Sequence, residues 1–317
     1  MSKTPTLKEL REKVSSLVIG QDNLVNTVTL QIYRHILRLY GEKMGIVPSY
    51  PNNLLITGES GTGKTFAVRT VCEELNWPLI EINAASLTRI GFKGESAAVQ
   101  IGNARKKLSN RYSSSSLRQC VVFIDEIDKI CQKLASSSDE DYNYTLQCSL
   151  LKILEGADSL LTDEVGHDSK SFCFILAGAF SGIEGKHVGI GFEDNVRKSF
   201  KESSTKLLVS YGLMPELVGR LSSIVSTEPY TREKYREVLL SEDFVCNKWI
   251  SYLRAIGMQG EFCPNYSEAI TNALSKKLGV RGLISEIEPY INAMIDNSAS
   301  TLDLDKYLEF IDEKYKF

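Results

Sequence analysis

Eight residues, 58–65, constrain this chain more than any other part of its sequence. They read GESGTGKT, which matches the phosphate-binding pattern G-x-x-x-x-G-K-[ST]. The apolar run 54–56 comes directly before them, and a helical pattern begins near Lys64. A strand, a glycine-rich turn and a helix N-terminus in this order let backbone N–H groups converge on a phosphate chain. The segment therefore predicts a nucleotide site at the end of a strand in an α/β fold.

Each residue of this loop has a predicted part in nucleotide binding. The Lys64 ammonium is expected to neutralise the β- and γ-phosphate oxygens, and the Thr65 hydroxyl to ligate Mg²⁺. The alternative is a glycine-rich surface turn with an exposed lysine, and the strand–turn–helix context disfavours it. The predicted cofactor-binding residues of the loop are Gly58, Glu59, Ser60, Gly61, Thr62, Gly63, Lys64 and Thr65.

Two adjacent carboxylates supply the second part of the predicted site. Asp125 and Glu126 follow the apolar run 121–124, so they fall at the carboxyl end of a strand, where ligands of open α/β sheets bind. We expect Asp125 to hold Mg²⁺, often through its water, and Glu126 to activate the attacking water. A helix cap at Asp125 is the alternative, and it leaves Glu126 unexplained. The two motifs together predict a nucleoside triphosphate hydrolase.

The first two thirds of the chain alternate between short strand patterns and helical patterns. This alternation is typical of a parallel sheet that is covered by helices on both faces. A polar stretch at 136–144 reads as a loop because of its Ser, Asp and Glu content. The predicted strands lie at 54–56, 79–82, 121–124 and 172–177.

Strand patterns largely stop after Pro229, and the remaining chain is predicted to be helical. We therefore expect a large α/β domain with N-terminal helices over residues 1–227 and a small helical domain over residues 228–317. The helices of the small domain are predicted at 231–256, 266–277 and 280–298.

Composition excludes several classes of protein. The 37 Lys and Arg residues against 40 Asp and Glu residues give a net charge of −3, which lacks the broad basic field of a dedicated nucleic-acid binder. No apolar run approaches the roughly 18 residues of a membrane span, and the polar first residues lack a signal peptide's apolar core. The 7 cysteines contain no C-x-x-C pair and only 3 histidines accompany them, so we expect reduced thiols, no zinc site and a cytoplasmic location.

With these motifs in this order, the chain resembles the AAA+ ATPases, and within them the ClpX protein unfoldases. The resemblance covers nearly the whole sequence, and it implies a P-loop AAA+ large domain followed by an AAA+ lid. It also implies a ring, usually a hexamer, with ATP bound between neighbouring subunits. The segments that carry it are VIGQ at 18–21, DEIDK at 125–129, LLKILEG at 150–156, GAF at 178–180, MPELVGRL at 214–221 and GVRGL at 279–283.

The resemblance assigns four further residues to the nucleotide. It implies that Val18 and Ile19 contact adenine, and that Arg281 reaches the phosphates from the small domain. It also implies that Arg220 reaches the nucleotide of the next subunit. A guanidinium supplied by a neighbour would stabilise transition-state charge, which is an independent physical reason for such an arrangement.

Two loops resemble the segments with which the family handles other proteins. Gly91, Phe92, Lys93 and Gly94 occupy the position of the pore loop that grips polypeptide, although Phe replaces the usual Tyr and Lys93 an apolar residue. The alternative is a hairpin tip with Phe92 in the core. Ile190, Gly191 and Phe192 resemble the loop that docks on the ClpP peptidase, and the alternative is a loop that packs its own apolar residues.

The expected function is an ATP-driven protein unfoldase or remodeller, with protein substrates and a ClpP-type peptidase as partners and no membrane. A ring that remodels one protein assembly without degradation is the runner-up. A nucleic-acid motor is a third alternative, and only the ATPase core supports it. The family's N-terminal zinc-binding domain has no counterpart in this sequence, and the acidic stretch 156–170 replaces a basic pore-entrance loop. These departures concern the substrate, and they leave the ATPase motifs intact.

Overall fold

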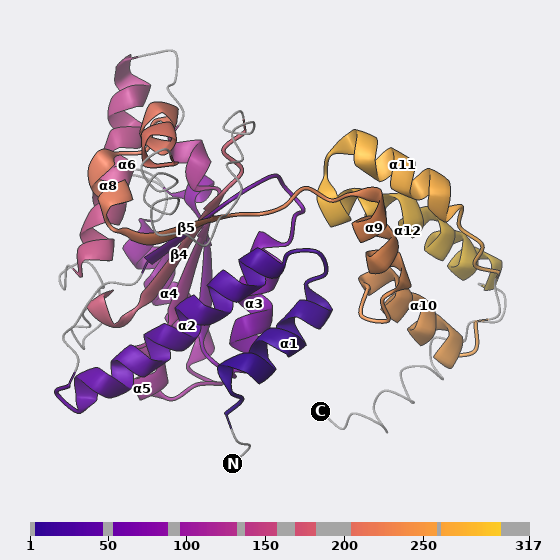
Figure 1. Ribbon diagram of the computed structural model, residues 1–317, viewed down its shortest axis with the longest axis horizontal. Coiled ribbons are helices and arrows are strands. Elements are labelled where there is room, and N and C mark those ends of the chain that lie inside the picture. Colours follow the sequence, from indigo (N-terminus) through magenta and orange to yellow (C-terminus); the bar gives the residue numbers. More distant parts are fainter. Residues whose placement is uncertain are drawn as a thin grey trace. The chain divides into compact units, whose positions relative to one another are not determined.

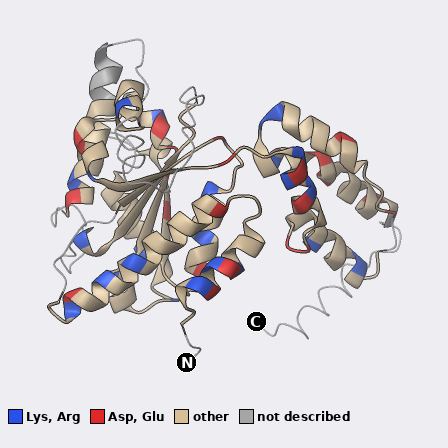
Figure 2. Cartoon of the chain, viewed as in Figure 1, with Lys and Arg blue, Asp and Glu red and all other residues tan. Residues whose placement is uncertain are grey.

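The computed structural model describes residues 4–46, 53–87, 96–131, 137–156, 169–181, 204–258 and 261–298, with the side chains of 137–142 left aside. The chain forms two compact units (Figure 1). The first contains Met1–Glu59 with Gly63–Glu228, and the second contains Ser60–Thr62 with Pro229–Phe317. On the described residues, positive and negative side chains are interspersed over the helices of both units (Figure 2).

A parallel sheet forms the centre of the first unit, as predicted, and it has five strands where the sequence indicated four. Its strand order is β2-β3-β4-β1-β5, and every strand pair in it is parallel. β5 is absent from the sequence prediction because three of its six residues are serines, which hide the apolar pattern of an edge strand. The strands are β1 (Asn53–Thr57), β2 (Leu79–Asn83), β3 (Val121–Asp125), β4 (Cys173–Gly178) and β5 (Leu221–Ser226).

Helices cover both faces of this sheet. Leu54 and Phe123 point to the face that α1, α2 and α3 cover, whereas Leu55 and Phe174 point to the face that α4, α6 and α8 cover. Alternate positions of a strand face opposite sides, so burial on both sides explains the nearly continuous apolar runs. The helices are α1 (Leu7–Leu17), α2 (Asp22–Lys43), α3 (Lys64–Glu74), α4 (Ala97–Leu108), α5 (Ser114–Leu117), α6 (Ser137–Glu155) and α8 (Pro215–Gly219).

Short 3₁₀ helices also occur in the described part of this unit, and one predicted loop is helical. The 3₁₀ helices are η1 (Ala84–Ser86), η2 (Ile127–Ile130) and η4 (Ser169–Ser171). The prediction of a loop over 136–144 is wrong, because α6 begins at Ser137. Serine and acidic residues are as common in the first turn of a helix as in loops, so composition alone does not separate the two.

The second unit is a helical bundle with α9 (Arg232–Leu240), α10 (Val245–Ala255), α11 (Tyr266–Lys276) and α12 (Gly279–Ser298). The single helix predicted over 231–256 is wrong, because Ser241 adopts an extended conformation and divides it into α9 and α10. The Asn247 side-chain amide donates to the carbonyls of Leu239 and Ser241, both at 2.8 Å. These bonds satisfy carbonyls that the end of α9 leaves without helical partners.

Candidate active site

The glycine-rich loop joins the carboxyl end of β1 to the first turn of α3. Gly58 (φ +143°) and Gly63 (φ +91°) both adopt backbone conformations that other residues rarely take. A Cβ atom on Gly58 would lie 1.8 Å from Thr227 Oγ1, so no larger residue fits there. Gly63 is the N-cap of α3 and has no side chain to occupy the free N–H groups of that helix end. The loop therefore presents backbone donors, as a phosphate site requires.

Lys64 is buried within this loop. Its Nζ donates to the Gly58 carbonyl at 2.6 Å and to the Glu59 carbonyl at 2.7 Å. The side chain is only 8% exposed although lysine is rarely buried without partners. The ammonium therefore lies on the inner side of the loop, in reach of a phosphate that the loop would hold.

Thr65 and Asp125 meet across the end of the sheet. The Thr65 hydroxyl, in the first turn of α3, donates to Asp125 Oδ2 at 3.0 Å, although the two residues are 60 positions apart in sequence. A hydroxyl and a carboxylate together with phosphate oxygens are the hard oxygen ligands that Mg²⁺ prefers. No cluster of three or more His, Cys, Asp or Glu residues able to hold a metal occurs in the described part of the chain. This pair therefore fits a metal ion that arrives with nucleotide.

Glu126 directly follows β3 and has a left-handed backbone conformation, with φ of 58°. Its N–H donates to Asp125 Oδ1 at 2.8 Å, and its Oε2 accepts from Asn83 Nδ2 at 3.0 Å. Asn83 ends β2 and pairs in register with Asp125 of β3. Sequence reasoning missed Asn83, although a polar residue at the end of a strand was a usable signal.

Asp128 ties the segment after Glu126 to the next strand. It is 2% exposed, and its Oδ1 accepts from the Ala179 N–H at 3.1 Å, just beyond the end of β4. The carboxyl ends of β2, β3 and β4 are thus connected through side chains of Asn83, Glu126 and Asp128.

The segment after α1 lies against the glycine loop. Val18 is buried, and a Cβ on Gly63 would lie 3.7 Å from Val18 Cγ1. The Gln21 side-chain amide joins this segment to the backbone of Glu228. It donates to the Glu228 carbonyl at 2.7 Å and accepts from the Glu228 N–H at 2.9 Å. Ile19, between them, is partly buried. The predicted adenine contacts are therefore held beside the loop.

Arg220 lies at the opposite edge of the sheet. It caps α8 and comes directly before β5, and its carbonyl accepts from Asn53 Nδ2 at 3.1 Å at the start of β1. The guanidinium pairs with Glu155, and both side chains are well exposed. The five residues of β1, Asn53–Thr57, separate this contact from the glycine loop, so the Arg220 backbone lies roughly 13–16 Å from that loop. The structure does not bring Arg220 to the phosphate loop of its own chain.

Arg281 belongs to the second unit, which also contains Ser60–Thr62. Within that unit, Arg281 Nη1 donates to Ser60 Oγ at 3.2 Å, and the Val280 N–H donates to the Gly61 carbonyl at 3.0 Å. Gly91, Phe92, Lys93 and Gly94 lie outside the described residues, as do Ile190, Gly191 and Phe192.

Comparisons with known proteins agree with this geometry. The model of the ATPase family associated with various cellular activities (AAA) matches residues 54–182, which include the glycine loop and both carboxylates. The ATP-dependent Clp protease ATP-binding subunit ClpX of Porphyromonas gingivalis is 30% identical over 308 positions, which cover 88% of this chain and 74% of that protein. This chain belongs to the ClpX family of AAA ATPases.

Further ClpX proteins give the same result. ClpX of Bacteroides fragilis is 29% identical over 317 positions, which cover 91% of this chain and 76% of that protein. ClpX 2 of Wolinella succinogenes is 29% identical over 311 positions, which cover 93% and 78% of the two chains. The predicted resemblance is therefore confirmed, and the chain is an ATP hydrolase that uses nucleotide with Mg²⁺.

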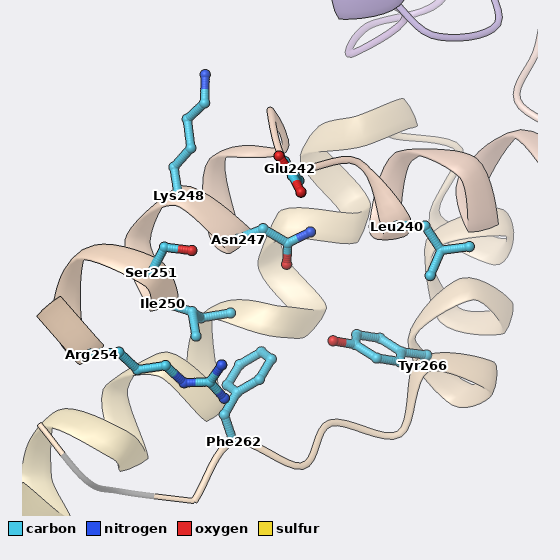
Figure 3. Close-up of a pocket in the computed structure, with 9 residues that line it drawn as sticks. All are labelled: Leu240, Glu242, Asn247, Lys248, Ile250, Ser251, Arg254, Phe262 and Tyr266. Atoms are coloured by element: carbon cyan, nitrogen blue, oxygen red, sulfur yellow. The ribbon is translucent and has the colours of Figure 1, made fainter.

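A hollow in the lid of this ClpX-family ATPase lies apart from the predicted nucleotide-site residues. It has a volume of about 770 Å³ and lies between α10 and the start of α11, where Asn247, Arg254, Phe262 and Tyr266 line it (Figure 3). None of the predicted site residues lines it. Asn247 and Lys248 in its wall already bond to a helix end and to Asp243, respectively. We therefore assign the hollow no part in nucleotide hydrolysis.

No helix in the described ranges of the chain combines the length and the apolar character that crossing a membrane requires. The 7 cysteines are all unpaired thiols. Burial raises the pKa of Cys120, Cys131 and Cys173 to about 12, so these thiols stay protonated at neutral pH. They serve as core residues of the sheet and its neighbours.

Proposed function

We propose that this ClpX-family ATPase is an ATP-driven protein unfoldase that works as a ring, usually a hexamer, in the cytoplasm. The position of Arg220 is the observation that carries the proposal. Arg220 lies at the amino edge of the sheet, next to Asn53, whereas Lys64, Thr65, Asp125 and Glu126 lie at the carboxyl edge. A second copy of the chain is the simplest source of a guanidinium for the phosphates, and a ring gives every site such a neighbour.

The chain's own residues have distinct parts in hydrolysis. Lys64 would hold the terminal phosphate oxygens, and Thr65 with Asp125 would hold Mg²⁺, which neutralises charge on the phosphates when bound. Glu126 would take a proton from the attacking water, in an orientation that Asn83 fixes. The guanidinium of Arg220 from a neighbouring copy would stabilise the charge that develops in the transition state.

The remaining nucleotide contacts come from two segments. Val18, beside Gly63, and Ile19 would contact adenine, and Arg281 would reach the phosphates from the lid. We keep the predicted domain ranges, a large domain over 1–227 and a lid over 228–317, as part of this proposal. Glycine loop residues 58–65 would surround the phosphates with backbone N–H groups.

Mixing two inactive variants tests the shared site. Glu126→Gln removes the base but keeps Arg220, and Arg220→Ala removes the guanidinium but keeps Glu126. Each alone is expected to hydrolyse ATP roughly 100-fold more slowly than wild type. In mixed rings, a Glu126→Gln subunit supplies Arg220 to a neighbour with an intact base. The mixture should therefore recover measurable turnover that neither variant has.

The double variant Glu126→Gln/Arg220→Ala is the control, since mixing it with Arg220→Ala supplies no guanidinium and should recover nothing. Mass measurement with ATP establishes that the variants assemble together. Co-assembly without recovery would contradict a shared site, and so would an Arg220→Ala protein with wild-type turnover.

Unfolding requires a loop that contacts substrate, and we propose Gly91–Gly94 with Phe92 at its centre. An exposed aromatic side chain offers contact area that is indifferent to substrate sequence. Phe92→Ala should hydrolyse ATP at the wild-type rate and fail to unfold a tagged, stably folded substrate. Normal unfolding by this variant would exclude Phe92 from the pore.

The relatives are named as subunits of a protease, so we propose that Ile190–Phe192 docks on a ClpP-type peptidase. Exposed apolar side chains are common anchors of such contacts. Deletion of the three residues should abolish binding of a purified ClpP-type barrel while ATP hydrolysis continues. Binding that survives the deletion would exclude docking at this loop. An intact chain that binds no such barrel would favour a remodeller that works without degradation.

A further inference from the structure

Helix α6 reaches both ends of the short helix that precedes Arg220. α8 begins after Met214 and ends at Gly219, and Arg220 is its C-cap. Gln147 of α6 bonds to the backbone of Met214, and Glu155 of α6 pairs with the Arg220 guanidinium. These two contacts join residues 67 and 65 positions apart in sequence.

The Gln147 side chain is buried, and both ends of its amide form hydrogen bonds. It is 3% exposed, and its Oε1 accepts from the Met214 N–H at 2.8 Å. Its Nε2 donates at 3.0 Å both to the Gly212 carbonyl and to the Ile130 carbonyl. One side chain thus joins the segment directly before α8 to the end of η2, the 3₁₀ helix that follows Glu126.

The backbone adds a direct contact between the same two segments. Gly212 has φ of +116°, and a Cβ atom there would lie 2.0 Å from the Cys131 carbonyl oxygen. The chain after the catalytic carboxylates and the chain before α8 are therefore packed as closely as two backbones allow. Because the two backbones are in contact, a shift of either segment displaces the other.

Glu155 completes the arrangement at the last residue of α6. Its side chain is 39% exposed and the Arg220 side chain is 47% exposed, so the pair lies at the surface. An exposed ion pair contributes little to the stability of a fold. Its larger effect is on the guanidinium, whose Nη2 donates to the Glu155 carboxylate.

We propose that Glu155 is a positioning residue for Arg220, acting together with Gln147 from the same helix. Gln147 and the Gly212 contact set the place of α8 relative to the segment after Glu126, and Glu155 sets the direction of the guanidinium. This inference rests on the proposed function, because it presumes that Arg220 serves the nucleotide of a neighbouring subunit. The long arginine side chain loses less freedom on meeting a phosphate when it is already restrained.

A double-variant cycle tests the inference. Glu155→Ala should lower kcat for ATP by about tenfold with KM little changed, because the lost restraint matters in the transition state. Arg220→Ala should lower kcat more. Adding Glu155→Ala to the Arg220→Ala protein should then cause no further loss, because Glu155 acts only through Arg220.

Two controls separate positioning from damage to the fold. Glu81→Ala breaks an Arg–Glu pair of nearly equal exposure, between Arg69 (49%) and Glu81 (35%), and should leave kcat unchanged. Glu155→Gln keeps an acceptor for Arg220 without the charge and should recover part of the loss. Melting temperatures of all variants should stay close to wild type.

The outcomes distinguish the two proposals. If Arg220→Ala turns over ATP as wild type does, the shared-site function fails. If Arg220→Ala is impaired and Glu155→Ala lowers kcat equally in both backgrounds, only the positioning role fails. Wild-type kcat for Glu155→Ala in an otherwise unchanged chain would also overturn it.

Discussion

The Asn83 side-chain amide donates a hydrogen bond to the Glu126 carboxylate, with 3.0 Å between Nδ2 and Oε2. The two residues come from neighbouring strands and are 43 positions apart. The bond engages one oxygen of the carboxylate, Oε2. The direction in which Glu126 points is therefore set by β2 as well as by its own strand.

Replacing Asn83 should impair hydrolysis without impairing binding. Asn83→Ala is expected to lower kcat roughly tenfold, because a general base must be aimed at its water. Steady-state ATPase assays and titration with a fluorescent nucleotide measure the two quantities. Asn83 also bonds locally to Ala85 and Ser86. Ser86→Ala, which removes the bond to the Asn83 carbonyl and one from Gln100, is the matched control and should be near wild type. An unchanged kcat in Asn83→Ala would show that this bond does not orient the base.

The Thr65–Asp125 contact predicts a change in metal requirement. Thr65→Ala removes one of the two proposed protein ligands of Mg²⁺, so the Mg²⁺ concentration for half-maximal hydrolysis should rise by roughly tenfold or more. Thr65→Ser keeps the hydroxyl and should behave as wild type. The measurement is ATPase rate against Mg²⁺ at fixed ATP. Equal Mg²⁺ curves for the alanine and serine variants would exclude Thr65 as a ligand.

Two glycines should respond to alanine in opposite directions. Gly212→Ala places a Cβ 2.0 Å from the Cys131 carbonyl at a positive φ, and should cost about 3 kcal/mol or more. Gly102 lies inside α4 with nothing within 4 Å of an added Cβ, so Gly102→Ala should stabilise by roughly 0.5–1 kcal/mol. Thermal denaturation compares both with wild type. A Gly212→Ala protein as stable as wild type would mean that the two segments can separate freely.

Buried His35 predicts how stability depends on pH. Burial lowers its pKa to about 4, despite the Gln119 carbonyl that favours the charged form, and nearby Arg38 lowers it further. The unfolded chain, with an ordinary pKa near 6.5, therefore binds the proton more readily than the folded chain between about pH 6.5 and 4. Stability should fall over this window as the pH drops, by about 1 kcal/mol at pH 5.5.

His35→Gln should remove this part of the pH dependence while leaving the rest. Denaturant unfolding at pH 7.5 and 5.5 measures it, with the difference between the two pH values as the readout. If the variant and wild type lose the same free energy of unfolding, His35 is not the group that titrates.

Several features of the chain were predictable because each depends on a short run of consecutive residues. The glycine loop 58–65, the carboxylates 125–126 and the apolar strands around them are local patterns, and each implies its own backbone conformation. β5 was missed because its three serines mask an edge strand. The helix predicted over 231–256 was wrong because Ser241 is extended, and the Asn247 side chain bonds to the carbonyls at the end of α9.

By itself, the sequence determined the glycine-rich loop 58–65, the adjacent carboxylates 125–126 and the parallel sheet that carries them. Only the tertiary structure decided which distant side chains meet: Asn83 with Glu126, Gln147 with Met214 and Glu155 with Arg220. A hydrogen bond requires its two atoms within about 3 Å, and that depends on strand register and on how α6 packs beside α8. Many polar residues of the sequence could have made such bonds, and the packing of the elements selected these.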